Sequence, residues 1–111
     1  MPDCIFCKII AGEIPSNKIY EDELVYAFRD IAPKAPVHFL VIPKAHIASA
    51  AELDGENTQY AARCLEAAAK LAKRLGLSSY RVVSNVGEQA GQTVFHLHFH
   101  VLGGRKLGSL G

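Results

Sequence analysis

The sequence has no tryptophan, a single methionine and almost no excess of charge of either sign. Twelve lysines and arginines stand against eleven aspartates and glutamates, so the formal net charge is +1 with the five histidines neutral. A chain without a broad basic surface is poorly suited to holding a nucleic-acid backbone. We therefore expect no nucleic-acid partner, and an anionic ligand has to be bound by a local site.

Long hydrophobic runs are missing as well. The longest apolar stretches are too short to cross a bilayer. The first fifteen residues, MPDCIFCKIIAGEIP, contain acids and cysteines and lack the basic start and apolar stretch of a secretory signal. We expect no membrane partner and a cytoplasmic location.

Cysteine is scarce, with only Cys4, Cys7 and Cys64. An odd number of cysteines in a chain without an export signal argues against a disulfide framework and favours reduced thiols or a metal site. Cys64 falls in a helical pattern, where a small buried hydrophobic residue is the simpler interpretation. The spacing Cys4-x-x-Cys7 is by itself a weak zinc signal, because the downstream pair of a zinc finger is absent.

The sequence does contain enough apolar residues, 50% of 111, for one domain with one core, so residues 1–111 are expected to form a single domain. Strand-like runs occupy 18–21, 25–29, 38–42, 80–84 and 94–102, and a short helix is expected at 4–11. One long helix is expected between Gly55 and Gly76. Strands that follow one another closely, with one long helix inserted, predict an α+β fold. The apolar face of the long helix is predicted to consist of Ala61, Cys64, Leu65, Ala68, Leu71, Ala72 and Leu75.

The five histidines occupy two segments, and the second of them alternates strictly with apolar residues. Because successive side chains of a strand point to opposite faces, the histidines should share one face and the apolar residues the other. The predicted core face is Phe95, Leu97, Phe99 and Val101, and the predicted open face is His96, His98 and His100.

Imidazoles on one stiff strand can divide the work of catalysis. A neutral ring can attack as a nucleophile while its neighbour orients it or donates a proton. A phosphorus centre suits such a row, because imidazolium and backbone N–H groups can meet the charge on its oxygens. The spacing alone leaves three interpretations open: catalysis or nucleotide binding, metal binding, and no function.

The segment His96-Leu-His-Phe-His-Val-Leu102 resembles, at every position, the signature of the histidine triad (HIT) family, His-φ-His-φ-His-φ-φ. Four further stretches resemble the Hint branch of that family, namely 4–15, 27–31, 35–44 and 101–105. The resemblance implies a half-barrel of five antiparallel strands with one long helix. It also implies a homodimer, formed through the helix and a strand, with a continuous sheet.

The resemblance implies hydrolysis of nucleoside phosphoramidates, such as AMP linked to an amine or to lysine. His98 would attack the α-phosphorus and form a covalent nucleotidyl intermediate, which water then releases. His100 would orient His98 and bind phosphate or leaving-group atoms, and His38 would complete the histidine network. Dinucleoside polyphosphate cleavage, a nucleotide-binding regulatory role without catalysis, and zinc storage or sensing are the alternatives.

The resemblance also assigns nucleotide contacts. Asp30 matches a carboxylate that accepts both ribose hydroxyls. Taken without the family, Asp30 is interpreted as a turn residue, and Phe6, Phe28 and Ile31 as ordinary core. Asn85 and Gly91 would then serve only the backbone of their loop. The positions that match the walls of the base pocket are Ile5, Phe6, Ile14, Phe28 and Ile31, and those that match the phosphate-side loop are Asn85, Gly91, Gln92 and Thr93.

Several bacterial-type members of the family carry the cysteine pair and complete a zinc site with two histidines. The resemblance assigns this site to Cys4, Cys7, His46 and His96, with a structural zinc that pins the N-terminal segment to the sheet. Free thiols or a redox pair are the alternative. No organic cofactor is expected. Because a zinc-bound His96 cannot carry protons freely, catalysis is assigned chiefly to His98 and His100.

Overall fold

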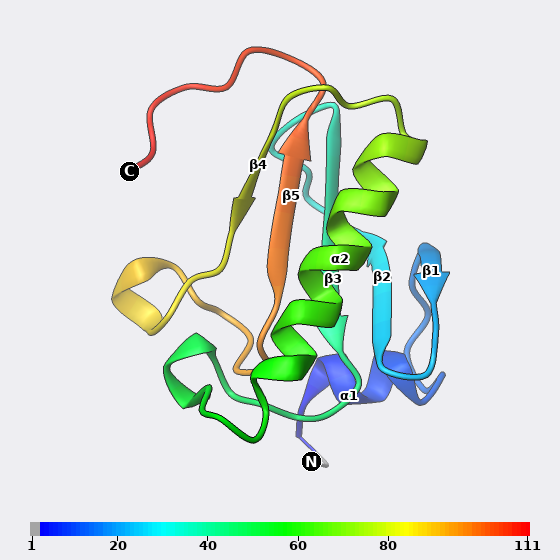
Figure 1. Ribbon diagram of the computed structural model, residues 1–111, viewed down its shortest axis with the longest axis vertical. Helices are drawn as coiled ribbons and strands as arrows, with labels where there is room; N and C mark the ends of the chain where they lie inside the picture. Colours follow the sequence, from blue (N-terminus) through cyan, green and yellow to red (C-terminus); the bar gives the residue numbers. More distant parts are fainter. Residues whose placement is uncertain (1–2) are drawn as a thin grey trace.

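The computed structural model describes residues 3–111, and it has the α+β architecture that the sequence predicts. Five antiparallel strands form one open sheet in the order β1-β2-β3-β5-β4. No helix in the described part of the chain has the length and apolar character needed to cross a membrane. The elements are α1 (Ile5–Ile10), β1 (Lys18–Glu21), β2 (Val25–Arg29), β3 (Val37–Pro43), α2 (Thr58–Arg74), β4 (Tyr80–Val83) and β5 (Phe99–Gly103), with short 3-10 turns at Ala50–Glu52 and Glu88–Ala90 (Figure 1).

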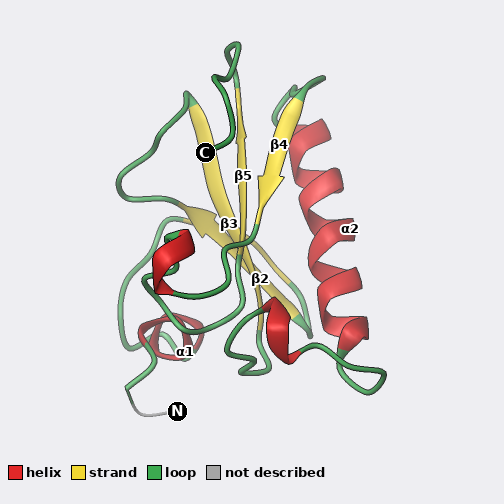
Figure 2. Cartoon of the chain, turned by 90° about the vertical axis from the view of Figure 1, so that its left-hand side faces the viewer, coloured by secondary structure: helices red, strands yellow, loops and turns green. Residues whose placement is uncertain are grey.

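The central strand β3 is covered on both faces, which explains its unbroken apolar run. α2 packs on one face of the sheet and α1 lies on the other (Figure 2). Phe39 and Val41 point into the core beneath α2, whereas Leu40 and Ile42 point into a second apolar cluster with Phe6 of α1. His38 alternates with Phe39, so its side chain lies on the α1 side of the sheet.

The helix α1 brings the side chains of Cys4 and Cys7 close together. Cys4 is its N-cap residue, and its sulfur accepts a hydrogen bond from the backbone N–H of Cys7 at 3.3 Å. The helix ends at Ile10 with Ala11 as its C-cap residue, and Gly12 follows at φ 82°, a left-handed conformation that favours glycine. One helical turn therefore separates the two thiols.

The long helix begins and ends inside the predicted limits, and Gly76 follows it at φ 77°. Its predicted apolar face was wrong at Leu65, whose side chain is 46% exposed. Each residue turns the helix by about 100°, and this step carries Leu65 off the stripe centred on Cys64 and Ala68. The buried face consists of Ala61, Cys64, Ala67, Ala68, Leu71 and Ala72.

The last strand is shorter than predicted, since β5 begins at Phe99 and not at Val94. The preceding residues leave the ladder, and the backbone N–H of Leu97 donates instead to the carbonyl of Ile47, a residue of the loop after β3. The placement of Phe95 on the core face was therefore wrong, because its side chain is 51% exposed. Leu97 and Phe99 do lie in the core beneath α2.

Candidate active site and metal-binding cluster

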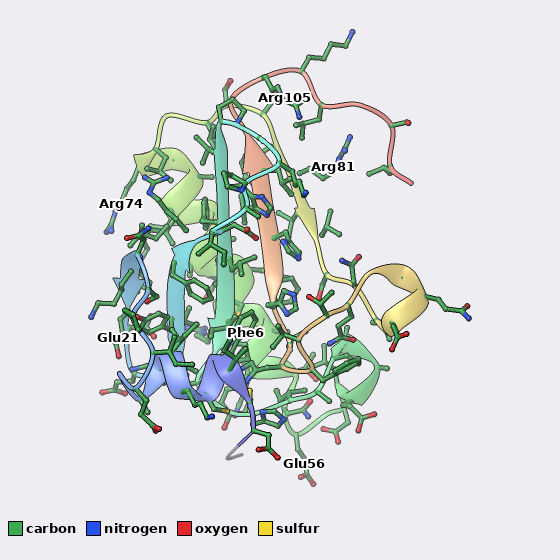
Figure 3. All side chains as sticks on the ribbon, turned by 180° about the vertical axis from the view of Figure 1, so that it is seen from behind. Phe6, Glu21, Glu56, Arg74, Arg81 and Arg105 are labelled. Carbon is green, nitrogen blue, oxygen red and sulfur yellow. The ribbon has the colours of Figure 1, made fainter. Side chains whose placement is uncertain are left out.

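His98 and His100 lie side by side on the face of the sheet opposite α2. Their ring centroids are 5.0 Å apart, and Phe6 packs edge-on against His98 at 5.1 Å. In Figure 3 this face is turned toward the viewer, with α1 and its residue Phe6 in front of the sheet. Antiparallel pairing with β3 sets Leu40 opposite His100 and His38 opposite Leu102. The topology thus brings His38 to His100 from a distant part of the sequence.

The hydrogen bond of His98 defines which of its nitrogens is free. Its Nδ1 lies 2.7 Å from the backbone carbonyl oxygen of His96. A carbonyl can only accept, so Nδ1–H is the donor and Nε2 of the neutral ring keeps its lone pair. Burial lowers the pKa of His98 below its ordinary value, which favours this neutral form. His98 therefore presents an unprotonated nitrogen, the form that can attack an electrophile.

A second chain of hydrogen bonds defines the protonation of His38 and His100. The backbone N–H of Lys34 donates to Nδ1 of His38 at 3.0 Å, so the neutral ring carries its proton on Nε2. That Nε2–H donates to Nδ1 of His100 at 3.0 Å, and His100 in turn keeps its proton on Nε2. Burial lowers the pKa of His38, and burial lowers that of His100 to about 4. Both rings are thus neutral near pH 7, and His100 offers an N–H donor.

Asp30 adds a carboxylate to this pair. Its Oδ2 lies 3.4 Å from Nε2 of His38, and its negative charge opposes the effect of burial on the pKa of His38. Its Oδ1 accepts from the backbone N–H of Ala32 at 2.7 Å, which is the contact of a turn residue. The turn interpretation of Asp30 is therefore satisfied by one oxygen, while the other faces the histidines.

The four residues assigned to zinc lie together, although they come from three separate segments. One ligand atom from each of Cys4, Cys7, His46 and His96 lies within 4.8 Å of the others. The Sγ of Cys4 is 3.3 Å from Nδ1 of His96, and the Sγ of Cys7 is 3.4 Å from Nδ1 of His46. This cluster could hold a metal ion.

The chemistry of the cluster fits zinc in two respects. Two thiols with two imidazole nitrogens form one of the common tetrahedral donor sets of that ion. In addition, Nε2 of His96 donates to the carbonyl oxygen of Pro43 at 2.8 Å, which leaves Nδ1 unprotonated toward the thiols. A second hydrogen bond of this kind is the usual way in which a ligating imidazole is oriented.

The residues matched to a base pocket separate into two groups. Phe6 and Phe28 are buried in the cluster beneath α1, with ring centroids 5.5 Å apart, and Ile14 packs against that cluster. Ile5 is 44% exposed and Ile31 is 96% exposed. The core interpretation therefore holds for the two phenylalanines and is wrong for Ile31, which lies at the surface. Ile5 and Ile31 both have surface free for a ligand.

The phosphate-side loop is held by a buried glutamine. Oε1 of Gln92 accepts from the backbone N–H of Gly87 at 2.9 Å, and its Nε2 donates to the carbonyls of Ala48 at 2.8 Å and Val94 at 3.1 Å. The side chain is 2% exposed. Gln92 can thus reach a ligand only through its main chain. A polar residue in a glycine-containing loop looks like a ligand contact in sequence, and no sequence signal reveals this bracing role.

The other loop positions remain open to a ligand. Thr93 and Gly91 are exposed, and Asn85 is half-buried. Gly91 has φ 104°, a left-handed conformation that side chains rarely adopt, whereas a Cβ there would make only an ordinary contact with Nδ2 of Asn85 at 3.6 Å. The loop conformation therefore depends on a glycine at this position.

Two of the cavities among the described residues bear on the location of the site. The larger, about 540 Å³, lies between the start of β4 and the C-terminal segment and contains none of the predicted site residues. The other, about 410 Å³, borders the metal cluster and the phosphate-side loop through Cys4, Ile5, His46 and Thr93. His38, His98 and His100 line neither cavity, and the second cavity reaches the predicted nucleotide contacts only at Ile5 and Thr93.

The chain is similar to known proteins over nearly its whole length. The sequence model of the HIT domain family matches residues 11–107. The purine nucleoside phosphoramidase of Escherichia coli K12 is 44% identical over 110 residues, which cover 97% of this chain and 92% of that protein. The solved structure of a HIT family hydrolase from Clostridium thermocellum is 50% identical, with a TM-score of 0.95 and coverage of 99% and 97%. A histidine triad protein from Clostridium difficile is 43% identical, with a TM-score of 0.95 and coverage of 100% and 98%.

Proposed function

Because this chain belongs to the HIT domain family, we propose that it hydrolyses purine nucleoside phosphoramidates and releases AMP from AMP-amine or AMP-lysine conjugates. The observation that carries the proposal is the hydrogen bond from Nδ1 of His98 to the carbonyl oxygen of His96. Because this hydrogen bond keeps the proton on Nδ1, Nε2 of the neutral, buried imidazole is unprotonated. Its lone pair is free to attack phosphorus. The name of the Escherichia coli relative supports the choice of substrate.

In the first step, Nε2 of His98 forms a bond to the α-phosphorus and the bond from phosphorus to the leaving nitrogen breaks. The leaving nitrogen takes a proton from water and departs as an amine. The modified ring is an imidazolium with phosphorus on Nε2 and its proton on Nδ1. The carbonyl of His96 stabilises that charge through the hydrogen bond already present, so no reorganisation is needed.

In the second step, water attacks the phosphorus, the bond to Nε2 breaks, and the pair of electrons returns to His98. The proton of the attacking water goes to solvent, and the product is AMP. The neutral ring and its hydrogen bond to His96 are restored. The overall reaction consumes one water molecule and yields one amine.

We assign His100 a hydrogen-bonding role in both steps. Its Nε2–H donates to a phosphate oxygen or to the leaving group while Nδ1 accepts from His38. The N–H of Lys34 already occupies Nδ1 of His38, so an additional proton has no place on the pair without breaking a hydrogen bond. His38 and His100 therefore work as neutral donors, in agreement with their lowered pKa values.

The remaining assignments follow the same residues. Asp30 accepts the ribose hydroxyls through Oδ2. The base packs against Ile5 and Ile31 above the buried layer of Phe6, Phe28 and Ile14, and the phosphate meets the loop with Asn85, Gly91, Gln92 and Thr93. We further propose one structural zinc held by Cys4, Cys7, His46 and His96, which ties α1 to the segment before β5. Residues 1–111 form one domain that functions as a cytoplasmic homodimer with a continuous sheet.

Steady-state assays test the proposed activity. The chain should hydrolyse adenosine phosphoramidate faster than a diadenosine polyphosphate, and His98→Asn should reduce both rates by about a thousandfold or more, since a nucleophile is removed. If the dinucleotide is hydrolysed faster, the substrate is a dinucleoside polyphosphate, and the mechanism through His98 is unchanged. Tight AMP binding without turnover of either compound would instead establish a nucleotide-binding protein.

A further inference from the structure

A continuous path of hydrogen bonds leads from an exposed arginine to the histidine pair. Nη2 of Arg105 donates to the carbonyl oxygen of Lys34 at 2.7 Å. The N–H of the same residue, Lys34, donates to Nδ1 of His38 at 3.0 Å, and Nε2 of His38 lies 3.0 Å from Nδ1 of His100. The main chain of Lys34 therefore makes two contacts: its carbonyl accepts from Arg105, and its N–H donates to the ring of His38.

The end of β5 brings Arg105 to this place. β5 ends at Gly103, and Gly104 follows with φ 97°. A Cβ at Gly104 would lie 3.0 Å from Cβ of Pro36, so the chain here passes directly against the loop between β2 and β3. Figure 3 shows Arg105 at this end of the sheet. The segment that directly follows the strand of His100 therefore supplies the residue that holds the 30–36 loop.

The loop of residues 30–36 contains two elements of the site, Asp30 and the backbone of Lys34. Among the hydrogen bonds of its described residues, Asp30 N–H donates to the carbonyl of His38 at 3.0 Å, which fixes the base of the loop. At its far side the side chain of Arg105 makes the contact with the carbonyl of Lys34. The Lys34 side chain is exposed, and only its main chain takes part.

We propose that Arg105 is a positioning residue for the reaction: by holding the carbonyl of Lys34, it aims the N–H of that residue at Nδ1 of His38 and so selects the tautomer in which His38 donates to His100. The arginine touches neither substrate nor the reacting atoms. Its kinetic consequence rests on the proposed phosphoramidase activity, whereas its effect on the His38 tautomer is independent of any substrate.

The fold gives matched controls. Arg81 of β4 also donates from Nη2 to a backbone carbonyl, that of Gly108 at 2.8 Å, but it makes no hydrogen bond to the 30–36 loop. Arg81→Ala thus removes an equivalent contact that does not involve the 30–36 loop. Lys34→Ala removes a side chain but keeps both main-chain groups, and Arg105→Lys keeps one donor that can reach the Lys34 carbonyl.

The test combines histidine side-chain nitrogen NMR with kinetics on Arg105→Ala, Arg105→Lys, Arg81→Ala and Lys34→Ala. Wild type, Arg81→Ala and Lys34→Ala should show His38 in the Nε2–H tautomer. Arg105→Ala should show a mixture of tautomers, with kcat/KM for adenosine phosphoramidate lowered about tenfold, as expected from slight misplacement of a hydrogen-bonding group. Arg105→Lys should stay within about threefold of wild type.

The outcomes separate this inference from the proposed function. If wild type does not hydrolyse the phosphoramidate, the proposed function fails, and the tautomer of His38 in Arg105→Ala still decides the role of the arginine. An unchanged His38 spectrum in Arg105→Ala, with activity no lower than in Arg81→Ala, would overturn the inference. Thermal unfolding of each variant identifies a loss caused by unfolding, in which case the milder Arg105→Gln replaces Arg105→Ala in both measurements.

Discussion

The Nδ1 of His98 lies 2.7 Å from the carbonyl oxygen of His96, two residues earlier in the same segment. The partner that orients the proposed nucleophile is therefore a backbone group and not a carboxylate, in contrast to the Ser-His-Asp arrangement of serine hydrolases. A carbonyl cannot remove the proton, so His98 keeps Nδ1–H while Nε2 forms and breaks a bond. The side chain of His96 meanwhile belongs to the metal-binding cluster, which joins the two sites through one residue.

Removal of either N-terminal thiol should cost the protein its metal. Wild type is expected to contain about one zinc per chain, and Cys4→Ser or Cys7→Ser should lower both the zinc content and the melting temperature, because binding energy of a structural ion is folding energy. Elemental analysis and calorimetry measure these quantities. The control is Cys64→Ala in the buried face of α2, which should keep its zinc. Full zinc content in both serine variants would contradict the assigned ligands.

Acidification should destabilise the fold through His38 and His100. Burial lowers the pKa of both rings, that of His100 to about 4, whereas an unfolded histidine titrates near 6.5. Between these values the unfolded chain binds more protons, so the free energy of unfolding falls as pH drops through this window and is steady above it. The contribution of His100 should be about 1–3 kcal/mol, with allowance for its partial solvent access.

Urea unfolding at several pH values measures this dependence. His100→Asn removes one of the buried rings whose pKa is lowered and should show a shallower decline between pH 6.5 and pH 4 than wild type. Equal slopes in the two proteins would show that His100 is not held neutral by burial.

Gln92→Glu should loosen the phosphate-side loop. The change replaces an amide nitrogen that donates to two carbonyl oxygens with a carboxylate oxygen that repels them, at a position only 2% exposed. We expect a loss of about 2–4 kcal/mol in the free energy of unfolding and a higher KM. Gln89→Glu makes the same chemical change at an exposed position of the same loop and should leave both quantities near wild type. If both substitutions change the free energy of unfolding and KM equally, Gln92 does not brace the loop.

Asp30 should discriminate ribose from its deoxy analogues. Wild type is expected to bind AMP at least tenfold more tightly than 2′,3′-dideoxy-AMP, the magnitude of a hydrogen bond to a charged group. In Asp30→Asn the ratio should approach one, whereas Glu23→Gln in the distant β1–β2 turn should keep it. Titration calorimetry with the two nucleotides supplies the ratio. Equal affinity of wild type for both nucleotides would assign Asp30 to the turn alone.

Much of the fold is local enough to be predicted from the sequence. The long helix follows from its apolar spacing and from Gly76, and α1 follows from Gly12 after a short apolar run. The start of β5 could not be predicted, because it depends on the hydrogen bond of Leu97 to Ile47, which lies 50 residues away and has no side-chain signature. The exposure of Phe95 follows from the same event.

The site was predicted as a set of residue types but not as a set of protonation states. The alternating histidines and the cysteine pair are visible in the sequence, and the fold brings them into two clusters. The partners that select each tautomer are main-chain groups of His96, Lys34 and Pro43. Every residue carries such groups, so only the folded geometry reveals which of them contact the rings.

The most direct test of the account is the covalent state of His98 during turnover. The protein is mixed with adenosine phosphoramidate, quenched within milliseconds under conditions that preserve phosphorus–nitrogen bonds, digested and analysed by mass spectrometry. We expect an adenylate on the peptide that contains His98, and neither adduct nor turnover in His98→Ala. Turnover at the wild-type rate in His98→Ala, with no adduct in wild type at any quench time, would contradict it.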